Sequence, residues 1–193
     1  MSSEYVYPLS RHQARLTNAE HSVMCHLNND TFVWIDGSGN PASTKLPTQF
    51  SGLTITSLDL VEDAPKVYPT LAFKVRPGSQ RETDFGEYTQ PQEFACDIEV
   101  WCSISSSGSQ SDNWKRTAQQ RRNMLDCMKL LFETNGGQFP LRDASNTEAG
   151  TDIGTQTGWL TVMNFRGWLP DDSPGRISAA FTMRVDTSHH ATV

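Results

Sequence analysis

Apolar and polar residues alternate over "EFACDIEVWCSIS", residues 93–105. Every even position from Phe94 to Ile104 is apolar, whereas the odd positions include the carboxylates Asp97 and Glu99. Successive side chains of a β-strand point to opposite faces of its sheet. The pattern predicts a strand with one buried face and one mostly solvated face.

The period changes after the break "SSSGSQSD", residues 105–112. From Asn113 to Thr134 the apolar residues follow a spacing of about 100° per residue, which is typical of an amphipathic α-helix. The expected buried stripe contains Trp114, Thr117, Arg121, Met124, Leu125, Met128, Leu131 and Phe132. We expect this helix to begin after a cap at Ser111 or Asp112 and to end at "NGG", residues 135–137.

Shorter segments predict the other elements. A short helix is expected at residues 17–29, strands near 31–35, 52–60 and 71–75, and a C-terminal hairpin from the segments 158–170 and 175–187. Polar loops are expected at about 36–50, 78–92 and 135–157. The chain is thus predicted to be one α+β domain over residues 1–193. Its expected core is a mostly antiparallel β-sheet covered by one long and one or more short α-helices.

Composition and charge disfavour several classes of function. The 193 residues carry a formal net charge of −6, which disfavours a general nucleic-acid binder. The four cysteines form no CxxC pair, so we expect free thiols in a reducing cytoplasm and no zinc site. The sequence shows no secretory signal and no apolar run near the ~20 residues that span a bilayer, so we expect a soluble protein without a membrane partner.

Candidate chemistry is sparse. His21 and Cys25 share one face of the expected short helix at metal-compatible spacing, but two ligands do not make a site. Asp97 and Glu99 share a strand face and could form an acid–base pair, although solvated surface charge is the simpler interpretation. We therefore expect no catalytic residue, no cofactor and no metal, and we do not expect an enzyme.

Arg121 lies near the centre of the apolar stripe and allows two interpretations. Its aliphatic stem can cover apolar area while the guanidinium reaches the edge of the sheet, as long basic side chains commonly do. Alternatively, it forms a buried ion pair across a subunit boundary, with Asp97 or Glu99 as partner. The first interpretation is favoured by the sequence. The candidates for subunit contacts are Asp97, Glu99, Trp101, Arg116, Arg121, Arg122 and Leu130.

The order of these elements resembles that of the tail-terminator, or tail-completion, proteins of long-tailed bacteriophages. The resemblance rests on Asp97-Ile98-Glu99-Val100-Trp101, then the Ser/Gly-rich break, then the helix from Arg116 to Phe132. It covers the middle third of the chain, and elsewhere it extends to the order of elements.

This resemblance implies a structural virion protein, assembled in the host cytoplasm, that forms a hexameric ring at the head–tail junction. Its partners would be the tail tube protein and the head connector or stopper protein, and DNA would cross the channel without specific binding. An acidic chain suits such a channel, because like charge suppresses phosphate binding. Another neck or tail component, such as a stopper or a tube protein, is the nearest alternative. A small soluble enzyme and a ligand-binding module remain open as well.

Overall fold

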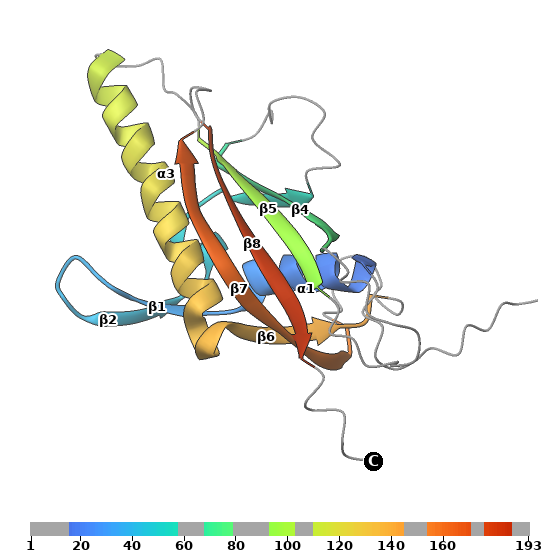
Figure 1. Ribbon diagram of the computed structural model, residues 1–193. Coiled ribbons are helices and arrows are strands. Elements are labelled where there is room, and N and C mark those ends of the chain that lie inside the picture. The colour runs from blue at the N-terminus through green and yellow to red at the C-terminus, as the bar shows by residue number, and fades with distance from the viewer. Residues whose placement is uncertain are drawn as a thin grey trace, which may run out of the picture.

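The computed structural model describes residues 16–57, 68–78, 93–102, 110–144, 154–170 and 176–186 (Figure 1). Within the helices and strands, the side chains of residues 110–116, 166–170, 176–177 and 186 lie outside this description. The element order mixes short helices with strands, as in an α+β protein.

The N-terminal part contains a helix and a small two-stranded sheet. Helix α1 (Leu16–Asn29) confirms the short helix expected at residues 17–29, and it buries Ala19, Val23 and Leu27. Strands β1 (Phe32–Ile35) and β2 (Pro41–Thr44) then form an antiparallel hairpin, followed by the short helix α2 (Leu46–Gln49). The turn of the hairpin is closed by Asp36, whose side-chain Oδ1 accepts the N–H groups of Ser38 and Asn40.

A six-stranded sheet makes up the rest of the β structure. Its strands are β3 (Thr54–Ser57), β4 (Thr70–Pro77), β5 (Glu93–Trp101), β6 (Gln138–Arg142), β7 (Gln156–Pro170) and β8 (Arg176–Asp186). The spatial order is β3-β4-β5-β8-β7-β6, and every pair is antiparallel except β3–β4. The predicted mostly antiparallel sheet and its C-terminal hairpin, β7–β8, are thereby confirmed.

One face of this sheet is covered by helices, and we call it the covered face. On β5 it carries Phe94, Cys96, Ile98 and Val100, all at most 1% exposed, which confirms the predicted buried face. Helix α1 lies behind the sheet in Figure 1. Helix α3 (Gln110–Glu133) contributes a buried stripe that includes Met124, Leu125, Met128, Leu131 and Phe132. The other face, which we call the open face, has no helix or strand packed on it among the described residues.

Aromatic rings join the helices to the sheet. Phe132 of α3 lies 4.6 Å from Phe181 of β8 and 5.8 Å from Phe139 of β6, measured between ring centroids. Phe165 stacks on Phe181 at 5.9 Å. It reaches the covered face because β7 has a register shift at Asn164, where φ is 50°, so one extra residue changes the alternation.

The start of the long helix differs from expectation. The helix begins at Gln110, before the expected cap at Ser111 or Asp112, and it ends at Glu133. The end is as predicted in kind: η2 (Thr134–Gly137) contains Asn135, Gly136 and Gly137 with φ of 55°, 70° and 81°. Such left-handed conformations suit asparagine and glycine and stop a helix.

Two of the expected loops are partly ordered. The segment 36–50 contains β2 and α2, and the segment 135–157 contains β6 and the first residues of β7. Strand β2 pairs with β1, and strand β6 pairs with β7. Their short or polar sequences do not predict this backbone pairing. In the third expected loop, 78–92, all residues after Gly78 lie outside the described residues.

Candidate functional site

Asp97 lies on the open face of β5 between its cross-strand neighbours Lys74 of β4 and Ala180 of β8. Its carboxylate accepts a hydrogen bond from the guanidinium of Arg76, and the two side chains form an ion pair. Arg76 is diagonal to Asp97 in the register, a distance that a long side chain spans. The charge of Asp97 is therefore already partnered within the chain.

Glu99 and Trp101 form a second polar pair on the same face. The indole Nε1–H of Trp101 donates to Oε2 of Glu99 at 3.1 Å. Both side chains are half-buried. The interaction links two residues that are two positions apart on one strand, so it orders the end of β5 without involving the covered face.

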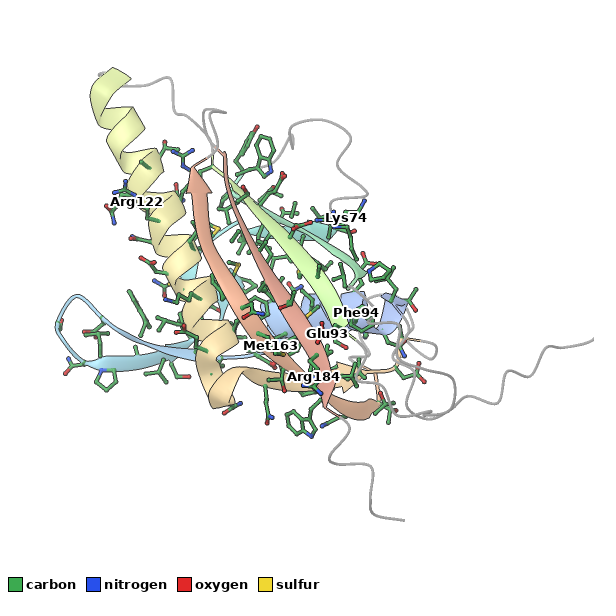
Figure 2. All side chains as sticks on the ribbon, viewed as in Figure 1. Lys74, Glu93, Phe94, Arg122, Met163 and Arg184 are labelled. Carbon is green, nitrogen blue, oxygen red and sulfur yellow. The ribbon has the colours of Figure 1, made fainter. Side chains whose placement is uncertain are left out.

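Small side chains surround these groups. The cross-strand neighbours of Ala95, Asp97 and Glu99 on the open face include Ala72, Ser178, Ala180 and Thr182. At the other end of β5, Glu93 lies opposite Arg184, whose side chain is exposed; both are labelled in Figure 2. The open face thus combines small side chains with the charged side chains of Lys74, Arg76, Asp97, Glu99, Glu93 and Arg184.

The second group of candidates lies on the outer side of α3. Arg122 is exposed and extends away from the sheet (Figure 2). Leu130 is 41% exposed on the same helix, next to the ion pair between Lys129 Nζ and Glu133 Oε1 at 3.7 Å. Arg116 belongs to α3, but its side chain lies outside the described residues. The sheet and the outer side of α3 therefore present two separate candidate surfaces.

Arg121 is half-buried and lies close to the end of β5 on the covered side. Burial raises the pKa of the Cys102 thiol to about 11, and the positive charge of Arg121 opposes this rise. Asp97 and Glu99 lie on the opposite face of β5, so the sheet separates them from Arg121 within one chain. Both interpretations of Arg121 stay predictions.

His21 and Cys25, the two residues of α1 at metal-compatible spacing, are in contact. Sγ of Cys25 lies 3.4 Å from Nε2 of His21. Burial raises the pKa of the Cys25 thiol, although the charge of Arg142 opposes the effect. A raised pKa leaves less of the reactive thiolate, so this pair is poorly suited to nucleophilic chemistry. Cys25, Cys96, Cys102 and Cys127 are all free and buried, as the sequence predicts for the thiols.

His26 has a structural environment that sequence reasoning missed. It is 5% exposed, stacks on Phe139 at 4.4 Å and lies 5.0 Å from Phe132. Its Nδ1 lies 2.5 Å from Oδ2 of Asp30, while Nε2 is buried and has no hydrogen-bond partner in the described part of the chain. A histidine next to the apolar side of a short helix gives no sequence signal that distinguishes this arrangement from a surface position.

The most exposed apolar side chains were also missed. Val33 and Ile35 are 58% and 62% exposed, and both lie on β1. The hairpin β1–β2 projects past α3, away from the large sheet (Figure 1). We call this hairpin the arm, residues 32–44. All four residues of β1 are apolar, so no alternation in the sequence indicates which of them face solvent.

In the described ranges, no three His, Cys, Asp or Glu side chains come together so that they could hold a metal ion. No described helix is both long and apolar enough to cross a bilayer. Comparison with models of known protein families finds no match, and comparison with curated protein sequences finds none either.

Proposed function

We propose that this protein forms a ring at the head–tail junction of a long-tailed bacteriophage, where it caps the tail tube, ends tail growth and docks the tail to the head connector. The observation that supports this most is that strand β5 and helix α3 each present a surface to solvent, namely the open sheet face and the outer side of α3. The open sheet face and the outer side of α3 are different surfaces of one chain. A contact between different surfaces is heterologous and closes into a ring when its rotation allows.

The character of both surfaces supports a structural role. The carboxylates of Asp97 and Glu99 are partnered by Arg76 and Trp101, so neither is presented as an unpartnered acid or base. The net charge of −6 suits a channel through which DNA passes without binding. The proposed ring has six copies, in line with the resemblance at residues 97–132.

Removing the protein from the phage tests the function directly. Electron microscopy of particles assembled without it should show tails of abnormal length or tails that fail to join heads. A stopper is expected to leave tail length normal, so this measurement separates the two roles. A tube protein would leave no tails at all, and the 24-residue helix α3 already argues against a β-dominated tube subunit.

Two further results would contradict the proposal. Light scattering that shows a strict monomer at all concentrations, even with tail tubes present, is incompatible with a ring. An enzymatic activity of the purified chain that is lost in Asp97→Asn or His21→Ala, with the fold intact, would support a small enzyme instead.

A further inference from the structure

Each of the two sheets ends in one protected and one unprotected edge strand. At β6 the protection is direct, because the N–H of Arg142 donates to Oγ of Ser22 in α1 at 2.8 Å. Pro140, two residues earlier on the same strand, has no N–H to offer. A foreign strand therefore finds few backbone donors along this edge.

The arm has the same asymmetry. The N–H of Asp36 donates to the carbonyl of Asn40, which closes the hairpin, and the register pairs Ile35 with Pro41 and Val33 with Ser43. In an antiparallel ladder the bonded and non-bonded pairs alternate, so Val33, Ile35, Pro41 and Ser43 turn their backbone outward. Proline removes one of the two outward donors of β2 and leaves that of Ser43, whereas β1 keeps the N–H groups of both Val33 and Ile35.

The opposite edge of the large sheet, β3, is unprotected within the described part of the chain. The N–H of Thr54 donates to the carbonyl of Pro69 at 3.0 Å, so Thr54 and Thr56 turn their backbone toward β4. Alternation directs the N–H and C=O of Ile55 outward. Among the described residues no backbone hydrogen bond reaches these outward groups.

Neither unprotected strand carries a charge. Strand β1 reads "FVWI" and β3 reads "TITS", and each has four residues. Soluble proteins usually place lysine, proline or a bulge on an exposed edge to prevent pairing with other chains. A two-stranded ribbon of this size is also marginal alone in water. An apolar, uncharged edge on a projecting ribbon is suited to being covered.

We propose that the arm of one copy of this protein binds a second copy by strand addition, with β1 pairing along the free edge of β3. The chain itself supplies both members of the pair: two short, uncharged edges whose counterparts, β2 and β6, are protected. Because β1 and β3 are different surfaces, the contact is heterologous and repeats from copy to copy. The closure of such a chain of contacts into a ring rests on the proposed function.

Disulfide trapping between two variants of the full chain tests the contact. Ile35→Cys places a thiol on the arm, and Thr54→Cys places one on exposed β3, while the native thiols are all buried. Under mild oxidation at high protein concentration, an equal mixture of the two variants should form mixed dimers several-fold faster than either variant alone. In a parallel pairing of β1 with β3, Ile35 lies opposite a residue whose backbone faces β4, such as Thr54. Residues directly opposite each other have Cα atoms within the ~7 Å that a disulfide requires.

Matched variants make the result specific. Gln138→Cys, on the protected edge β6, should cross-link poorly with Ile35→Cys. Adding Val33→Asp to the Ile35→Cys chain should remove most of its cross-link with Thr54→Cys. The same charge at Gln119, which is exposed on α3, should leave the cross-link unchanged. Circular dichroism confirms folding of each variant.

Each other outcome overturns the proposal. Absence of mixed dimers means that the edge is covered by something other than a second copy, and rapid dimers of Ile35→Cys alone mean that arm binds arm. Tail assays separate this inference from the proposed function. Normal tails in particles lacking the protein contradict the tail role while the trapped contact stands. Normal tails with Val33→Asp/Ile35→Asp, together with loss of tail control when the protein is absent, contradict the arm alone.

Discussion

The two faces of β5 have different chemistry although their residues alternate along one strand. On the covered face, Phe94, Cys96, Ile98 and Val100 fill a core and are almost fully buried. On the open face, Ala95, Asp97, Glu99 and Trp101 are half-buried, and the polar groups have partners in the same chain. The side chains of the covered face fill the core, whereas the open face combines a small side chain, Ala95, with charged groups that have partners. Such a surface is stable in water and still available for contact.

The largest effect should come from the covered side at Phe132. Phe132→Ala removes a ring that contacts His26, Phe139 and Phe181 and leaves a cavity, so the free energy of unfolding should fall by ~3–5 kcal/mol. Denaturant unfolding followed by fluorescence measures the loss. Leu130→Ala, on the outer side of the same helix, is the control and should change it by less than ~0.5 kcal/mol. Equal losses at both positions would contradict the assignment of faces.

Alkaline pH should weaken the covered side next. Burial raises the pKa of Cys102 and Cys127 from 9.0 to about 11. Below pH 9.0 both thiols are protonated in the folded and unfolded states, so their contribution to stability is complete. As pH rises toward 11, the unfolded chain loses these protons first, so the free energy of unfolding falls.

Denaturant unfolding at several pH values checks this loss. The double variant Cys102→Ala/Cys127→Ala should show a flatter dependence between pH 9 and 11 than the unchanged chain. An equally steep dependence in both proteins would show that other groups cause the loss.

The open face should respond less. Asp97→Asn weakens the ion pair with Arg76, whose side chain is 56% exposed, so the free energy of unfolding should fall by less than ~1 kcal/mol. The effect should shrink further in high salt, because exposed ion pairs are screened. Thermal unfolding at low and high salt measures both. A loss as large as that of Phe132→Ala would mean that the open face is part of the core.

Arg121 should give the smallest change in stability and the sharpest change in titration. Arg121→Met keeps an apolar stem over the sheet but removes the charge that opposes the raised pKa of Cys102, so that pKa should rise further. Titration of the thiol absorbance in a variant that lacks the other three cysteines follows this group. If assembly is lost while the monomer is intact, Arg121 instead pairs across subunits.

The sequence predicts those elements that pack one face on the core and leave the other toward solvent, because their apolar and polar residues then repeat regularly. Strand β5 and helix α3 follow such patterns, so most of their buried residues could be named, and the hairpin β7–β8 could be located. The arm could not, because β1 is apolar at all four positions and β2 reads "PAST". The extra residue at Asn164 also turns Phe165 to the covered face, and only the pairing of β7 with β8 reveals this shift.

The candidate residues were placed correctly on faces but not among their partners. Asp97 and Glu99 share the open face as the strand period requires. That Arg76 reaches Asp97 depends on the register of β4 and β5, which neither sequence specifies alone. Likewise, the protection of β6 by Ser22 joins residues far apart in the chain.

The turn at residues 134–137 has a consequence for the order of folding. It lets Phe132 and Phe139 meet across a very short loop, whereas the pairing of β5 with β8 joins residues about eighty positions apart. Closing a short loop costs little chain entropy, and local contacts of this kind favour fast folding. We therefore expect the end of α3 and strand β6 to form an early nucleus, with the two central strands joining it late.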